Sequence, residues 1–387
     1  MEILLDLTVS DSLLQLALIL FSAKLAGFIF DYFKQPRVLG ELSAGLVLGA
    51  NFLNLVNLNN ETILFLAEIG IIMLFFDLGM KSHAKELLEN SFHSFIVAFV
   101  VIVSTVFLTV SVLMLNRFEF GTSLFIGMVL AATGIGITTR TLIDAKKLKT
   151  REGTTVLISA MIVDLIVLIF LSVTANAFEA GKIEPADIAR TMIFLLFFVL
   201  ILIFLGKFMR KFISFKEKQN FKSTYIVSTF IFAVLVSFAA KELGLLTIMG
   251  AFAAGLVLER GEKIELVSEK THVLTDVFTP IFYVVAGATV SLQSVLIPEI
   301  MLLAAVLTLI AVTGKLVSGF GVWNTKISKM AVSSGMLAGG GVGLTFASFG
   351  LKKGIFVPEV YSAIVVVLII TTFLGAFLMR KSFEKIR

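Results

Sequence analysis

The stretch TTVLISAMIVDLIVLIFLSVTA (Thr154–Ala175) decides the fold class, because it is predominantly apolar and Asp164 is its one charged residue. An α-helix needs about 20 consecutive apolar residues to cross the hydrocarbon core of a bilayer. A carboxylate near the centre of such a helix costs roughly 2.5–3.5 kcal/mol on insertion scales, so it is a functional candidate by default. A second charge, Lys315, lies in the apolar stretch MLLAAVLTLIAVTGKLVSGF. The two charges together indicate a membrane protein that transports ions.

The composition of the whole chain agrees with this interpretation. Its 387 residues are 58% hydrophobic and 15% charged, with a mean hydropathy of +1.02, whereas soluble domains carry about 25% charged residues. We therefore expect an all-α polytopic protein whose main partner is the lipid bilayer. The net charge of +5 is no sign of nucleic-acid binding, because it follows from where the Lys and Arg residues sit. The absence of cysteine excludes disulfides and thiolate chemistry.

The apolar runs predict about thirteen transmembrane helices. Lys and Arg residues between these runs and in the C-terminal tail support the count, since 24 lie on one side of the membrane and 6 on the other. The positive-inside rule then places the C-terminus in the cytoplasm and the N-terminus outside a cell membrane. The predicted helices span 12–31, 37–54, 61–80, 90–115, 120–145, 150–177, 187–209, 222–240, 243–259, 272–294, 298–321, 328–351 and 356–380.

An internal repeat relates the two halves of the chain. GELSAGLVL (Gly40–Leu48) recurs as GAFAAGLVL (Gly250–Leu258), and TGIGIT (Thr133–Thr138) recurs as GGVGLT (Gly340–Thr345). A third match aligns Gly79 with Gly287. Chance recurrence of common membrane residues is the alternative, but three matches at nearly one offset disfavour it. Equivalent helices are seven apart, so the copies face opposite ways across the bilayer, as in the inverted repeats of alternating-access transporters.

This repeat defines the expected domain organisation. Residues 1–185 form the first half, with a broken helix at about 120–145. Residues 186–221 form a linking helix and a cytoplasmic hinge loop. Residues 222–387 form the second half, with a broken helix at about 328–351.

Two glycine clusters lie inside predicted helices, and they predict the breaks. The first contains Gly134 and Gly136, and the second contains Gly339, Gly340 and Gly341. Each Gly costs a helix interior about 1 kcal/mol relative to Ala, although close helix packing is an alternative reason for small residues. We expect two unwound points that cross near the membrane midplane, where freed carbonyls and half-helix ends can hold a charge.

Several of these stretches match a known pattern, namely QPRVLGELSAGLVLGA (35–50), LAEIGIIMLFFDLGMKSHAKEL (66–87), AATGIGITTRTL (131–142), TPIFYVVAGATVSL (279–292) and GKLVSGF (314–320). Together they resemble the monovalent cation:proton antiporters of the Kef and bacterial sodium/proton exchanger type. The resemblance implies that Asp164 is the ion-binding aspartate, that Lys315 occupies the basic position of the eleventh helix, and that Thr133 lies in the unwound stretch of the first crossover. It also implies a homodimer.

The chain departs from that family at Val163, where its members commonly have Asp or Asn before the ion-binding aspartate. With one carboxylate in place of two, we expect one proton to be exchanged for one cation, without net charge movement. Lys315 then has two interpretations: it either forms an ion pair with Asp164 that breaks on cation binding, or it extends to the membrane interface. Ser159 lies about one turn from Asp164 and is a further candidate ligand.

The sequence therefore predicts a secondary transporter that exchanges a monovalent cation, foremost Na⁺, for H⁺ by alternating access and without a cofactor. Li⁺ and K⁺ remain open as cations, and a K⁺/H⁺ antiporter is one alternative. A sodium-coupled symporter of an organic solute is another, and an ion channel is a third. A membrane enzyme is disfavoured, because the chain has no DDxxD or HExxH motif and no second aspartate for a protease dyad.

Overall fold

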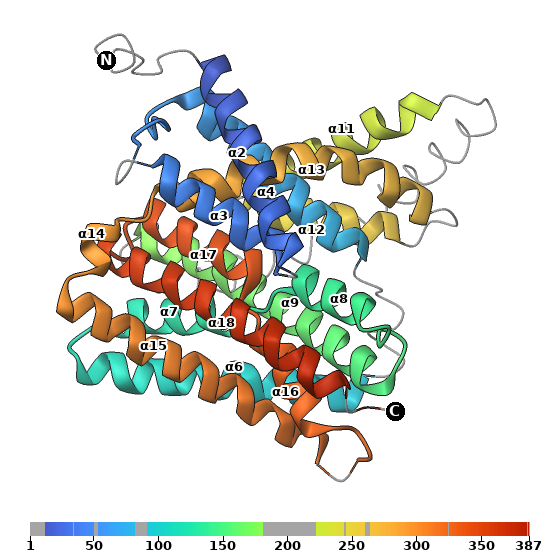
Figure 1. Cartoon of the computed structure of the whole chain (residues 1–387), viewed down its shortest axis with the longest axis vertical. Coiled ribbons are helices and arrows are strands. Elements are labelled where there is room, and N and C mark those ends of the chain that lie inside the picture. Colours follow the sequence, from blue (N-terminus) through green and yellow to red (C-terminus); the bar gives the residue numbers. More distant parts are fainter. Residues whose placement is uncertain are drawn as a thin grey trace. The chain divides into compact units, whose positions relative to one another are not determined.

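The computed structural model of this chain describes residues 12–33, 35–49, 53–81, 91–180, 222–243, 245–259, 264–323, 325–384 and 386. All regular elements within these ranges are helical (Figure 1). The helices are α2 (Ser12–Tyr32), α3 (Arg37–Leu48), α4 (Glu61–Lys81), α6 (Ser91–Leu115), α7 (Phe120–Ala131), α8 (Ile135–Asp144), α9 (Arg151–Ala180), α11 (Lys222–Glu242), α12 (Thr247–Glu259), α13 (Ile264–Ala288), α14 (Leu292–Val295), α15 (Pro298–Leu316), α16 (Lys329–Leu337), α17 (Gly340–Lys352) and α18 (Pro358–Glu384), with a 3₁₀ turn η1 (Val317–Val322) after α15.

Twelve of the thirteen predicted transmembrane segments fall on these helices. The seventh, at 187–209, and the hinge loop after it lie outside the described residues. Nine helical spans in the described ranges are long and apolar enough to cross a membrane, counting each broken helix as one span. The prediction of an all-α polytopic fold is confirmed. Individual ends differ from the prediction: α3 ends at Leu48 because Gly49 is extended, and α13 begins at Ile264.

The chain groups into two compact units, and each takes segments from both halves of the repeat. The first unit comprises Met1–Ile63, Glu86–Val167 and Tyr283–Arg387, and the second comprises Leu64–Lys85 and Leu168–Phe282. In the first unit, α18 packs against α15, α16 and α17, while α6 packs against α7 and α15. Figure 1 shows α6 and α15 side by side. This unit contains both broken helices.

Glycine contacts reveal the repeat in three dimensions. In the first unit, a Cβ on Gly40 of α3 would collide with the backbone of Ala26 of α2. In the second unit, a Cβ on Gly250 of α12 would lie 2.7 Å from the carbonyl oxygen of Val236 of α11. Both contacts pair residues of the recurring motif with residues of the helix before it, at the same offset. The internal repeat that the sequence predicted is therefore expressed as matching helix packing.

Candidate ion-binding site at a crossing of two broken helices

Both predicted helix breaks are present, and they cross each other. The first separates α7 from α8 at residues 132–134, and the second separates α16 from α17 at residues 338–339. The two unwound stretches are joined by a hydrogen bond in which the Gly134 backbone N–H donates to the Ala338 carbonyl at 2.8 Å. An unwound backbone inside a membrane is tolerated where it is buried in protein, and here Ala132, Thr133 and Ala338 are all buried.

Two glycines make this crossing sterically possible. A Cβ on Gly134 would lie 2.8 Å from the Cα of Gly340, and Gly340 itself has a φ of +49°. A positive φ of this kind is a conformation that glycine adopts without the penalty of a side chain. Gly136 and Gly341, by contrast, lie inside α8 and α17. Of the glycines predicted for the crossover, Gly134 and Gly340 therefore lie at the point of contact, and the others lie beside it.

Asp164 of α9 lies against the first break. Its side chain is buried, with the residue only 2% exposed. Its Oδ1 accepts a hydrogen bond from the Thr133 backbone N–H at 2.9 Å and faces the Thr133 hydroxyl at 3.1 Å. Thr133 immediately precedes Gly134, the N-cap of α8, so the carboxylate lies at the positive end of that half-helix. The sequence placed both residues at the crossover, and the structure brings them into contact.

The second carboxylate oxygen of Asp164 distinguishes this residue from a fully satisfied structural carboxylate. Oδ2 is buried and has no hydrogen-bond partner among the described residues. A buried polar atom without a partner is costly, and each such atom in a native structure calls for an explanation. Monovalent and divalent hard cations favour oxygen ligands. The free Oδ2 and the Thr133 hydroxyl oxygen are oxygens that a cation or a proton could use.

Lys315 lies in the last turn of α15 and is 1% exposed. Its ammonium group donates a hydrogen bond to the Ala132 carbonyl at 2.8 Å. This carbonyl lies at the carboxyl end of α7, where the helix dipole favours a positive charge. The interpretation of Lys315 as a side chain that extends to the membrane interface is wrong.

Lys315 and Asp164 therefore bind the same break at successive residues. Ala132 holds the ammonium group and Thr133 holds the carboxylate. Of the ion pairs formed within 4.0 Å by the described residues, none joins Lys315 to Asp164. The direct ion pair considered from the sequence is thus absent in this conformation, and the two charges interact across the break.

Ser159 is placed differently from the expectation. Its hydroxyl is buried and donates to the carbonyls of Thr155 at 2.7 Å and Ser94 at 3.0 Å. It joins α9 to α6 and makes no hydrogen bond with Asp164 that the structure records. Five residues along a helix exceed one turn, so Ser159 and Asp164 lie on different sides of α9.

The Ala132 carbonyl was not foreseen as the hydrogen-bond acceptor of Lys315, since a backbone carbonyl has no sequence signature beyond the helix break that frees it.

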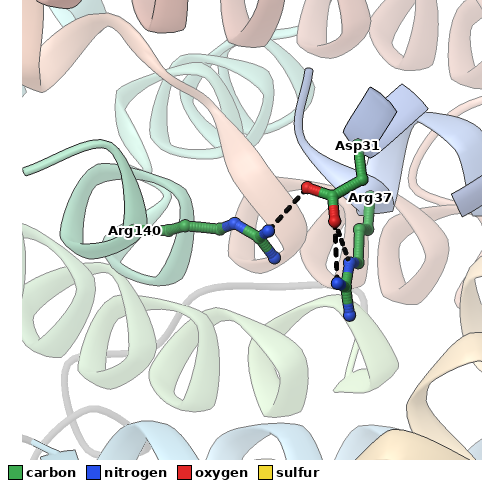
Figure 2. Close-up of polar contacts among 3 residues, drawn as sticks. All are labelled: Asp31, Arg37 and Arg140. Carbon is green, nitrogen blue, oxygen red and sulfur yellow. Dashed lines mark hydrogen bonds and ion pairs between the residues drawn. The ribbon is translucent and has the colours of Figure 1, made fainter. Parts of the chain in front are cut away.

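A cluster of charged residues around Asp31 was also missed in the sequence analysis. Asp31, in the last turn of α2, accepts hydrogen bonds from Arg37 of α3 at 2.7 and 3.1 Å and from Arg140 of α8 at 2.5 Å (Figure 2). The cluster links the α2–α3 turn to the half-helix that begins at the crossing.

Comparison with known proteins adds independent evidence. The transmembrane family model of the sodium/hydrogen exchangers matches residues 17–380. The chain is 30% identical over 420 residues to the high-affinity Na⁺/H⁺ antiporter NhaS3 of Synechocystis sp., covering 98% of this chain and 91% of that protein. It is 33% identical over 382 residues to the Na⁺/H⁺-K⁺ antiporter GerN of Bacillus cereus, covering 95% of each.

A solved structure gives the same fold. The sodium proton antiporter MjNhaP1 from Methanocaldococcus jannaschii, determined at pH 8, superposes with a TM-score of 0.78 at 15% identity, covering 96% of this chain and 97% of that one. The family resemblance drawn from the sequence motifs is confirmed, and so is the prediction of a transporter rather than an enzyme. A family model that matches nearly the whole chain, together with the crossed broken helices, leads to one conclusion: this protein belongs to the sodium/hydrogen exchanger family.

Proposed function

We propose that this exchanger binds Na⁺ and H⁺ in turn at Asp164, and that alternating access carries each across the membrane. The observation that supports this proposal is the buried Asp164 Oδ2, which has no partner among the described residues while Oδ1 is held by Thr133. Protonation of Oδ2 removes the charge from this unpaired oxygen. A cation bound by Oδ2 and the Thr133 hydroxyl oxygen would supply the partner that it lacks. One site that holds either ion couples their fluxes, because binding of one requires release of the other.

The exchange is electroneutral in this proposal. Val163, beside Asp164, is fully buried and supplies no second carboxylate. Lys315 is hydrogen-bonded to the Ala132 carbonyl instead of Asp164. A cation that binds Asp164 therefore need not displace the ammonium group, and Lys315 keeps its proton through the cycle. One proton then leaves for each cation that binds.

K⁺ is the second candidate cation, since the relative GerN is named as a Na⁺/H⁺-K⁺ antiporter. Li⁺ remains an alternative on chemical grounds. No contact among the residues that the structure describes favours a sodium-coupled symporter of an organic solute.

The orientation and assembly also belong to the proposal. The excess of Lys and Arg on one side supports a cytoplasmic C-terminus and an outside N-terminus in a cell membrane. The family resemblance supports a homodimer, and the repeat supports two halves, 1–185 and 222–387, joined by 186–221. Mass measurement of the purified protein in lipid nanodiscs would test the dimer.

The test of the ion site is proton flux in proteoliposomes after steps of Na⁺, Li⁺ or K⁺, with wild type and Asp164→Asn compared. Asparagine keeps the shape of the side chain but has no ionisable group, so we expect exchange to disappear while the folded protein is recovered in normal yield. Cation-driven proton flux in a folded Asp164→Asn protein would refute the site. Proton flux that K⁺ drives and Na⁺ does not, in the wild type, would identify K⁺ rather than Na⁺ as the transported cation.

A further inference from the structure

We propose that Thr372 of α18 is a positioning residue for the ion site, and that it acts on Asp164 through the second helix break. The proposal rests on the function proposed for Asp164 and names a residue that sets the geometry of its site. Thr372 is 2% exposed, and its Oγ1 accepts a hydrogen bond from the Gly340 backbone N–H at 3.2 Å. Gly340 is the residue that meets Gly134 at the crossing.

The internal repeat and its contacts make Thr372 the counterpart of Asp164. The two residues are 208 positions apart, and the two residues whose amides bond to them, Thr133 and Gly340, are 207 apart. Their contacts match as well: the break before α8 donates a backbone N–H to Asp164, and the start of α17 donates one to Thr372. Each half of the repeat thus holds its own broken helix by an oxygen from the transmembrane helix that follows it. One half uses a carboxylate, and the other uses a neutral hydroxyl.

Thr372 and Asp164 are linked by a short series of backbone hydrogen bonds. Thr372 fixes the Gly340 amide, and two residues earlier the Ala338 carbonyl accepts from the Gly134 amide at 2.8 Å. Gly134 follows Thr133 directly, and Thr133 donates to Asp164. Between the two side chains there are therefore only buried hydrogen bonds and the few peptide units that join them, without a flexible side chain in the series.

This arrangement gives Thr372 control over how Asp164 is held. If the Thr372 hydroxyl is removed, the Gly340 amide loses its acceptor and the second break is less firmly fixed. The Gly134 and Thr133 amides then become less well placed, and the hydrogen bond that favours the charged form of the carboxylate weakens. Cation binding requires the charged form, whereas proton binding removes it. We therefore expect weaker Na⁺ binding.

The experiment compares Thr372→Val with wild type and uses Thr371→Val as a matched control. Valine keeps the size of threonine and removes the hydroxyl. Thr371 is equally buried, but its hydroxyl donates only to the carbonyls of its own helix, Val367 at 2.9 Å and Leu368 at 3.2 Å. A typical hydrogen bond contributes enough that KM for Na⁺ should rise roughly three- to tenfold in Thr372→Val. Thr371→Val and Thr372→Ser should stay near wild type.

A second measurement tests the coupling without transport. Hydrogen exchange of the segment 131–136, which carries the Thr133 and Gly134 amides, should be faster in Thr372→Val than in wild type or Thr371→Val. If Thr372→Val does not fold, Thr372→Ala removes the same hydroxyl and is read in the same way. The proposal is overturned if the KM for Na⁺ and the hydrogen-exchange rate of Thr372→Val equal those of wild type, or if only its maximal transport rate falls. It is also overturned if Thr371→Val shows the same changes as Thr372→Val. Failure of the function at Asp164 is distinguishable, because it appears as surviving flux in Asp164→Asn and leaves the hydrogen-exchange result standing.

Discussion

Gly45 of α3 and Gly287 of α13 touch through their backbones: a Cβ on Gly45 would lie 2.9 Å from the Cα of Gly287, and a Cβ on Gly287 would lie 3.1 Å from the Cα of Gly45. The repeat counterparts of these residues, Gly255 and Gly79, make the same kind of contact in the second unit, where a Cβ on Gly255 would lie 3.0 Å from the backbone carbon of Gly79. Two of the glycine pairs that mark the repeat in the sequence, Gly45 with Gly255 and Gly79 with Gly287, are therefore made of glycines whose backbones meet.

The first prediction follows from this contact. Gly45→Ala places a methyl group against the Val284 carbonyl and the Gly287 backbone, which cannot move aside as a side chain can. Overpacking of this kind costs about 1–3 kcal/mol, so we expect a lower melting temperature and less folded protein. The control is Gly136→Ala, because a Cβ there meets nothing within 4 Å and a helix position gains up to about 1 kcal/mol from alanine. Equal stability of the two variants would contradict the packing argument.

The second prediction concerns Lys315. Lys315→Met keeps most of the side-chain volume but leaves the buried Ala132 carbonyl without the donor that the structure shows. An unsatisfied buried acceptor costs about 1–3 kcal/mol, and the carboxyl end of α7 also loses its positive neighbour. We expect a clearly lower thermal stability in detergent.

Lys352→Met is the control for this measurement, since Lys352 is exposed in the last turn of α17. Surface substitutions of that kind are usually within about 0.5 kcal/mol of neutral. If the Lys315→Met and Lys352→Met proteins have the same melting temperature, the hydrogen bond from Lys315 to Ala132 contributes nothing measurable to thermal stability.

The third prediction concerns the charge that each cycle moves. With Asp164 as the one carboxylate that exchanges its proton and Lys315 protonated throughout, one H⁺ replaces one Na⁺. Sodium-driven proton flux in proteoliposomes should then be unaffected by a membrane potential imposed with valinomycin and a potassium gradient. An empty-vesicle control corrects for passive leak. A flux that follows the sign of the potential would require a second proton, for which Lys315 is the available group.

Much of the site was predictable because membrane insertion makes charges and glycines conspicuous. Asp164 and Lys315 stood out from their apolar helices, and the glycine clusters located both breaks to within a few residues. The partner of Lys315 was not predictable, because any freed carbonyl looks alike in sequence. Extending the repeat from Asp164 leads to Thr371 at an offset of 207 and to Thr372 at 208, but a threonine in an apolar helix is too ordinary to attract notice without a structure.

The ion pair between Asp31 and Arg140 links the broken helix to the salt concentration of the surrounding solution. Arg140 is 45% exposed and Asp31 28% exposed at their side chains, and exposed pairs contribute only about 0.2–1 kcal/mol each. A rearrangement that carries α8 away from the α2–α3 turn must separate Arg140 from Asp31, so this small energy is added to the difference between the conformations. Salt screens such pairs. In a cycle that includes such a rearrangement, the balance between the two conformations depends on the total ionic strength beside the membrane, in addition to the concentrations of the exchanged ions.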